Sequence, residues 1–331
     1  MAMLLNCLVL VVGFVLLVKG ADFFVDGSSG VARRLRVPGV VIGLTVVAMG
    51  TSLPEASVSI TAGLTGNNGL SLGNVIGSNI FNLMVVACFC ALMMSFVPDK
   101  ELMVRDFPVC IGASALLVFF MWDDVLQRWE GIVMLGLMAA YIALTVVQAL
   151  ASRTPESEEE PVSLLRCIAF ILLGMAAIIW GGDLVVDSAS NIAAALGLSQ
   201  TLIGLTIVAV GTSLPELATS IVAARKGESG LALGNAVGSC IFNILFILGA
   251  SSALTPIESA RGVLVDGIIM TVPHQGPDDQ AHGRGGPAGL CGLHRLPHRQ
   301  RIKRPGGHVK NVSARFFVQR FKSQHTAMHT G

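Results

Sequence analysis

Long apolar runs separated by short polar loops fill the first 272 residues of the 331-residue chain. A helix that crosses the hydrocarbon core of a bilayer, about 30 Å thick, needs roughly 17 to 25 predominantly apolar residues. Eight runs meet this requirement, near residues 3–32, 38–64, 69–97, 106–122, 129–151, 164–194, 199–224 and 229–254. The pattern predicts an all-α polytopic membrane protein with about eight clear spans.

Composition supports a location in the bilayer and excludes an ordinary water-soluble enzyme. Hydrophobic residues make up 53% of the chain, charged residues only 13%, and the mean hydropathy is +0.72. A typical soluble domain carries about 25% charged residues. A soluble fold of this length leaves much of its surface in water and cannot hide so many apolar side chains.

The composition changes near residue 272. Residues 1–272 carry 12 Lys and Arg against 19 Asp and Glu, a net charge of −7, whereas residues 273–331 carry 10 against 2, a net charge of +8. All seven histidines also lie after residue 273. Because the last 59 residues contain no apolar run near 17 residues, we expect a basic tail that does not cross the membrane.

A short acidic segment divides the spans into two groups. The sequence TPESEEEP at residues 154–161 is the only polar linker before residue 272. We expect a first unit of five spans at residues 1–151, an acidic linker at residues 152–163 and a second unit of three spans at residues 164–272. Lys and Arg in short loops favour the cytoplasmic side. Nine loop cations fall on one side against two on the other, which predicts an N-terminus outside.

The two units contain copies of one segment. At an offset of 161, residues 43–83 match residues 204–244 at 25 of 41 positions without a gap. Both copies contain Gly-Thr-Ser-Leu-Pro-Glu followed by Gly-Asn-x-x-Gly-Ser-x-Ile-Phe-Asn. Five expected crossings separate the two copies, so the second has the opposite orientation. Inverted repeats with interrupted helices are the architecture in which secondary transporters build ion sites near the bilayer midplane.

Each copy places a proline and a glutamate inside an expected span. An ionised carboxylate at mid-bilayer costs at least about 2.5 to 3.5 kcal/mol, so Glu55 and Glu216 are candidate functional residues. Pro54 and Pro215 lack an N–H, which frees the carbonyl four residues earlier to face a cation. A lone proline is usually only a kink and a lone glutamate can be structural. Their recurrence on inverted halves favours a site.

The side chains around each glutamate are oxygen donors. On a helix, Thr51 and Ser52 share a face with Glu55, and Ser78 and Asn82 share another. Hard oxygens suit Ca²⁺ and Na⁺ rather than soft transition metals, no histidine precedes residue 274, and no Cys-x-x-Cys pair occurs. Two converging carboxylates would carry −2 when empty, which a divalent cation, protons or monovalent ions can balance. Exchange of these occupants is the physical basis of antiport.

The repeated motif resembles the calcium/cation antiporter superfamily, specifically bacterial sodium/calcium exchangers, over residues 1 to about 270. The resemblance implies an inverted-repeat cation exchanger fold of 5+5 spans, with ions held between spans two, three, seven and eight. By that resemblance the metal ligands are Thr51, Ser52, Glu55, Ser78, Asn82, Thr212, Ser213, Glu216, Ser239 and Asn243, with the backbone carbonyls of Ala48 and Ala209.

The resemblance also implies a function: secondary active exchange of Ca²⁺ for Na⁺ or H⁺ by alternating access in a bacterial inner membrane. We expect inorganic cations and the lipid bilayer as partners, no nucleic acid, and no cofactor beyond the transported ions. The alternatives are an antiporter for another cation and an inactive, truncated homologue. An intramembrane hydrolase needs an open substrate cleft, whereas the spacing of Gly73 and Gly77, and of Gly234 and Gly238, favours tightly packed helices.

Two features depart from the family pattern. Some family members carry Asp where this chain has Asn243, so the protonation and the stoichiometry can differ. The ninth and tenth spans should follow Pro256, yet the chain becomes rich in Pro, Gly, Arg and His instead. An altered reading frame explains this change, and a genuine basic tail is the alternative.

Overall fold

The computed structural model describes residues 2–93, 101–151, 163–199, 203, 206–207 and 209–258. The predicted acidic linker and basic tail lie outside this part. The helices of the first unit are α1 (Ala2–Leu35), α2 (Gly39–Ile42), η1 (Gly43–Val47), α3 (Ala48–Thr51), α4 (Leu53–Leu64), α5 (Asn68–Phe81), η2 (Asn82–Val86), α6 (Ala87–Met93), η3 (Leu102–Asp106), α7 (Phe107–Phe120), η4 (Met121–Asp123) and α8 (Arg128–Ala151). Those of the second are α9 (Leu164–Ala195), α11 (Ala209–Gly211), α12 (Leu214–Arg225), α13 (Ser229–Phe242), η6 (Asn243–Leu248) and α14 (Gly249–Leu254).

The described helices confirm an all-α polytopic membrane protein. Six helical stretches are long and apolar enough to cross a membrane: Met3–Leu35, Asn68–Met93, Leu102–Asp123, Arg128–Ala151, Leu164–Ala195 and Ser229–Leu254. A bent pair, Gly39–Thr51 with Leu53–Leu64, supplies a seventh. The span expected near residues 199–224 falls partly on residues outside the described part, so it stays a prediction.

The helix break predicted at the repeated motif is present in both copies. Between α3 and α4 the chain bends by 51°, and Ser52 leaves helical geometry with φ −86° and ψ 11°. Ser213 has φ −93° and ψ 5° directly before α12. Pro54 and Pro215 lie in the first turn of the helix after each break, where a missing N–H has no intrahelical partner to lose.

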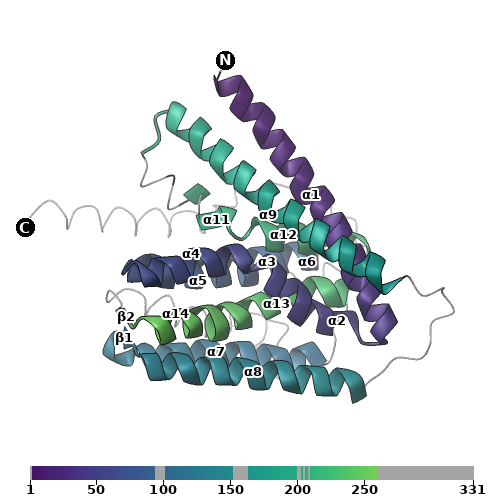
Figure 1. Cartoon of the computed structure of the whole chain (residues 1–331), viewed down its shortest axis with the longest axis vertical. Coiled ribbons are helices and arrows are strands. Elements are labelled where there is room, and N and C mark those ends of the chain that lie inside the picture. The colour runs from purple at the N-terminus through teal and green to yellow at the C-terminus, as the bar shows by residue number, and fades with distance from the viewer. Residues whose placement is uncertain are drawn as a thin grey trace, which may run out of the picture. The chain divides into compact units, whose positions relative to one another are not determined.

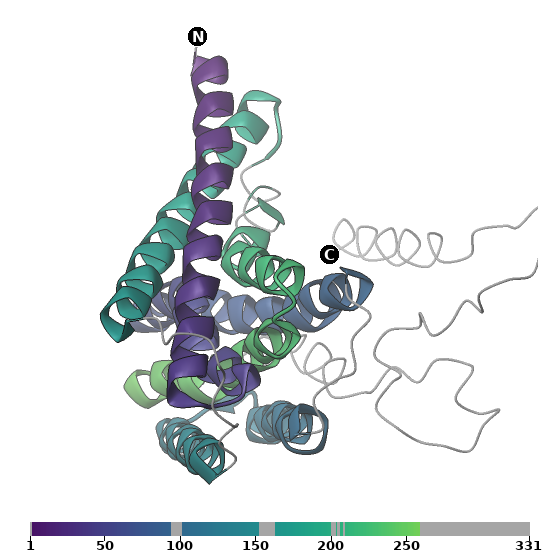
Figure 2. The same cartoon turned by 90° about the vertical axis from the view of Figure 1, so that its right-hand side faces the viewer.

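Helices α1 and α9, equivalent in the two repeats, lie side by side along much of their length (Figures 1 and 2). Glycines allow their backbones to approach closely. A methyl group at Gly174 would lie 2.5 Å from the backbone nitrogen of Phe24, and one at Gly181 would lie 2.6 Å from that of Leu17. Close approach through small residues drives helix association in lipid, where apolar side chains gain little from leaving the lipid tails.

Helix α13 and its continuation occupy the interior of the described bundle. Within an apolar 18-residue window, 94% of the residues are buried in the Ser229–Leu254 stretch, against 39% in its repeat equivalent, Asn68–Met93. Ser229–Leu254 is covered by α7 and α8, which pack against α13, η6 and α14 (Figure 1), and by α2, η1 and α3, which pack against α13. The antiparallel pair β1 (Val125–Leu126) and β2 (Ile257–Glu258) joins the turn before α8 to the segment after α14.

The tight glycine packing expected from the sequence is confirmed in the second repeat. A methyl group would lie 2.7 Å from the carbonyl oxygen of Val40 at Gly234 and 2.7 Å from the Cα of Leu44 at Gly238. No atom of the described residues lies within 4 Å of the same position on Gly73 or Gly77. The segment that would pack there by internal symmetry, near residues 201–209, is largely outside the described part.

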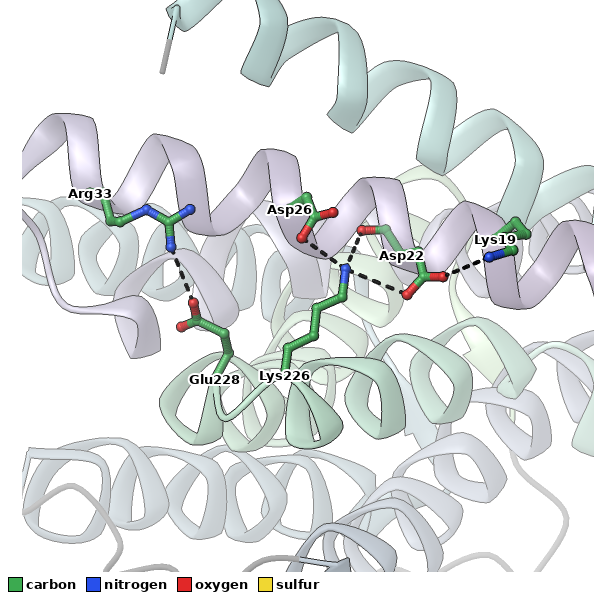
Figure 3. Close-up of polar contacts among 6 residues, drawn as sticks. All are labelled: Lys19, Asp22, Asp26, Arg33, Lys226 and Glu228. Atoms are coloured by element: carbon green, nitrogen blue, oxygen red, sulfur yellow. Dashed lines mark hydrogen bonds and ion pairs between the residues drawn. The ribbon is translucent and has the colours of Figure 1, made fainter. Parts of the chain in front are cut away.

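Ion pairs join α1 to the turn between α12 and α13, as Figure 3 shows. Lys226 Nζ lies 2.8 Å from Asp26 Oδ1 and 3.4 Å from Asp22 Oδ1, and it donates to the carbonyl oxygen of Asp22 at 3.1 Å. Arg33 and Glu228 form a second pair at 3.5 Å between the same elements. These partners explain the α1 carboxylates without assigning them to an ion site.

The equivalent place in the other half, formed by the turn between α4 and α5 and by α9, lacks these ion pairs among the described residues. The equivalent of Lys226 is Thr65, whose hydroxyl donates to the carbonyl oxygen of Thr61 at 2.9 Å. Asp183 and Asp187 replace Asp22 and Asp26. No described residue forms an ion pair with either of them. The ion pairs therefore break the internal symmetry.

Replacing Gly174 with Ala should lower the free energy of unfolding by about 1–3 kcal/mol, because the new methyl group must push α1 away from α9. Gly136→Ala on α8 is a matched control, since no atom of the described residues lies within 4 Å of that position. It should be neutral or stabilising, because Ala favours a helix over Gly. Thermal unfolding in detergent measures both, and equal effects would contradict the packing argument.

Replacing Lys226 with Thr should lower the free energy of unfolding by at most about 1 kcal/mol, because the partners are partly exposed. The difference from the wild-type protein should shrink as salt rises above about 0.1 M. Lys19→Thr is the control for the loss of one positive charge. The partner of Lys19, Asp22, lies on the same helix, at 3.6 Å, so this pair joins no two elements. A Lys226→Thr effect that is independent of salt would point to packing of the side-chain stem instead.

Candidate functional site

Glu55 and Glu216 lie in the first turns of α4 and α12, directly after the two breaks, and both are fully buried. Each receives a hydrogen bond from the serine of the other copy. Ser52 Oγ donates to Glu216 Oε1 at 2.8 Å, and Ser213 Oγ donates to Glu55 Oε1 at 3.2 Å. The two copies of the motif therefore face each other, and neither carboxylate is served by its own copy's serine.

Asn74 on α5 forms hydrogen bonds with the residues around the first break. Its Nδ2 donates to Ser59 Oγ at 2.9 Å and to the carbonyl oxygen of Glu55 at 3.4 Å. Its Oδ1 accepts from Thr212 Oγ1, from the other repeat, at 3.5 Å. One amide thus joins the following helix to both halves of the site.

Asn235 on α13 repeats this arrangement for the second break. Its Nδ2 donates to Ser220 Oγ at 2.9 Å and to the carbonyl oxygen of Glu216 at 3.2 Å, and its Oδ1 accepts from Thr51 Oγ1 at 3.1 Å. The sequence analysis assigned no role to this asparagine, to its equivalent Asn74, or to their serine partners Ser59 and Ser220. Their identity in both copies of the repeat was the available signal.

Several oxygens of the predicted ligands have no hydrogen-bond partner. Among the described residues, thirteen buried side-chain polar atoms have no partner, and seven of them belong to predicted ligand residues. The six oxygens are Oε2 of Glu55 and Glu216, Oγ of Ser78 and Ser239, and Oδ1 of Asn82 and Asn243; the seventh atom is Nδ2 of Asn82. A buried polar atom without a partner is costly, and a cation bound by these oxygens would remove the cost.

The helices that carry these oxygen donors pack against the helices that carry the glutamates. η6, which begins with Asn243, packs against α4, which carries Glu55. η2, which begins with Asn82, packs against α12, which carries Glu216. The donors are carboxylates, hydroxyls and amides, the ligand class that Ca²⁺ takes in sets of six to eight. The described residues contain no group of three or more His, Cys, Asp or Glu that could hold a metal ion.

The remaining predicted ligands are Ala48, Thr212 and Ala209. The carbonyl oxygen of Ala48 accepts the Ser52 N–H at 3.1 Å. Thr212 is only partly buried. Ala209 is the first residue of α11, and its carbonyl stays a predicted ligand.

Comparison with known proteins gives a consistent family. The family model described as sodium/calcium exchanger protein matches residues 5–147 and 167–275. A putative antiporter, CaxA of Alkalimonas amylolytica, is 39% identical over 262 residues, covering 77% of this chain and 82% of its own. The inner membrane protein YrbG of Escherichia coli is 37% identical, with the same coverage. The sodium/calcium exchanger MaX1 of Methanosarcina acetivorans is 33% identical, covering 77% and 85%.

Solved structures give the same answer for the fold. A structure of the sodium-calcium exchanger NCX_Mj superposes with a TM-score of 0.74 at 33% identity, over 82% of this chain and 90% of that one. The protein is thus an integral membrane protein with the exchanger fold and is not an enzyme. The chain belongs to the sodium/calcium exchanger protein family of cation antiporters.

Proposed function

We propose that the protein is a secondary active antiporter that exchanges Ca²⁺ for Na⁺ or H⁺ by alternating access. The crossed contacts Ser52–Glu216 and Ser213–Glu55 carry this proposal. Each uses one carboxylate oxygen and leaves the other without a partner among the described residues. The membrane would be a bacterial inner membrane, with the N-terminus outside.

Charge balance explains how one site serves two kinds of ion. Two ionised carboxylates in a buried site repel each other and are poorly solvated. One Ca²⁺ neutralises both, and so do two protons or two monovalent cations. The charged, unoccupied site opposes closure, whereas either filled form permits it. Alternating access with this rule couples the two fluxes. The cations are cargo, so no cofactor is required.

Replacing Glu55 or Glu216 with Gln should reduce Ca²⁺ uptake into everted membrane vesicles by more than about tenfold. Gln keeps the size of the side chain and an oxygen for the serine, so the main loss is one negative charge facing the cation. Glu130→Gln is a matched control, because Glu130 lies on α8 and accepts the backbone N–H of Gln127 at 2.7 Å. Normal uptake in both site variants would overturn the proposal.

Imposed ion gradients identify the driving ion. An opposing gradient of Na⁺ or of H⁺ should accelerate Ca²⁺ uptake, whereas K⁺ alone should not. If neither Na⁺ nor H⁺ drives Ca²⁺, but one of them drives another cation, the protein is an antiporter for that cation instead.

A further inference from the structure

One residue of the first repeat contacts the residue at the equivalent position of the second repeat. Asn79 on α5 corresponds to Cys240 on α13 at the offset of 161. Asn79 Nδ2 donates to the carbonyl oxygen of Cys240 at 3.2 Å, and Cys240 Sγ donates to the carbonyl oxygen of Asn79 at 3.7 Å. The approximate two-fold relation between the repeats therefore passes between these residues, which differ in chemistry.

The hydrogen bonds fix the direction of two amide groups. The Cys240 carbonyl can only accept, so the NH₂ group of Asn79 must face it. The Oδ1 of Asn79 then needs a donor, and Asn243 Nδ2 supplies one at 3.0 Å. This leaves the Oδ1 of Asn243 buried and without a partner among the described residues. An amide orientation is normally ambiguous, but here it follows from a backbone acceptor.

The equivalent asparagine in the first repeat has no such hydrogen bond among the described residues. Asn82 is the equivalent of Asn243, and the residue that could hold it by symmetry is Cys240. A thiol is only a weak acceptor. Both side-chain polar atoms of Asn82 lack a partner among the described residues. One amide of the site is therefore held in a fixed orientation, whereas its counterpart is not.

We propose that Asn79 is a positioning residue that holds the Asn243 amide with its oxygen toward the transported cation. The inference rests on the proposed function of the site. Ser239, one helical turn before Asn243, also has an unpartnered oxygen. A ligand held in its binding orientation does not have to be ordered when the cation arrives, so affinity rises. The reverse orientation would turn an NH₂ group toward the cation and oppose binding.

The variant Asn79→Cys tests this role with a residue that the protein already places at the equivalent position. It removes the acceptor for Asn243. The Ca²⁺ concentration at half-maximal uptake should rise about 3- to 10-fold, as expected for the loss of one hydrogen bond. The maximal rate should change less than about twofold. Ca²⁺-dependent thermal stabilisation of the purified protein should shift to higher concentration by the same factor.

Two further variants separate positioning from a structural role. Cys240→Ala keeps the backbone carbonyl that accepts from Asn79, so the half-maximal concentration should change less than about twofold. The double variant Asn79→Cys with Cys240→Asn moves the acceptor to the other half, where it can hold Asn82. Recovery of affinity in the double variant supports positioning.

The outcomes distinguish this proposal from the proposed function. An unchanged half-maximal concentration in Asn79→Cys, while Glu55→Gln abolishes uptake, overturns the role of Asn79 alone. A fall in maximal rate and protein yield, with the half-maximal concentration unchanged, shows a structural role and also overturns it. Normal uptake in Glu55→Gln and Glu216→Gln, or no response of the wild-type protein to Ca²⁺ in uptake or stabilisation, overturns the function of the site itself.

Discussion

Two carboxylates buried together are the constraint on which the rest of the structure depends. Glu55 and Glu216 are both removed from solvent, and a buried charge is tolerated only when other groups or ions compensate it. One oxygen of each accepts a serine hydroxyl from the opposite repeat, while the other has no described partner. The protein alone compensates this pair incompletely, so the cation that we propose for the site would complete its electrostatic balance.

The crossed hydrogen bonds also explain why two inverted copies are needed. Because Ser52 serves Glu216 and Ser213 serves Glu55, neither repeat completes its own carboxylate. The same rule holds for the asparagines, since each accepts a hydroxyl from the repeat to which it does not belong. A movement of one repeat against the other would therefore disturb the hydrogen bonds of both carboxylates together, which is how the proposed exchange would couple occupancy of the site to the conformation of the bundle.

The sequence predicts which segments form this site better than it predicts the hydrogen bonds and ion pairs between them. A proline and a carboxylate repeated in apolar spans were enough to predict a bent segment at each copy of the motif, whereas the roles of Glu55 and Glu216 as cation ligands stay predictions. The roles of Asn74 and Asn235 could not be assigned, because asparagine is common in loops and helix caps and its partner depends on tertiary packing. The pair between Lys226 and Asp26 could not be predicted either, because the fold joins positions 200 residues apart. The acidic linker and the basic tail stay predictions.

The differences between the two halves matter as much as their similarity. Two identical inverted repeats would give the inward-facing and outward-facing states equal free energies in a symmetric environment. At equivalent positions of the two halves, Lys226 in the second corresponds to Thr65 in the first, and Cys240 corresponds to Asn79. A bias of only 1.4 kcal/mol changes the ratio of two states about tenfold. In the proposed alternating-access mechanism, the shared motif would determine what the site can bind, whereas such unequal positions would determine which face it prefers to open.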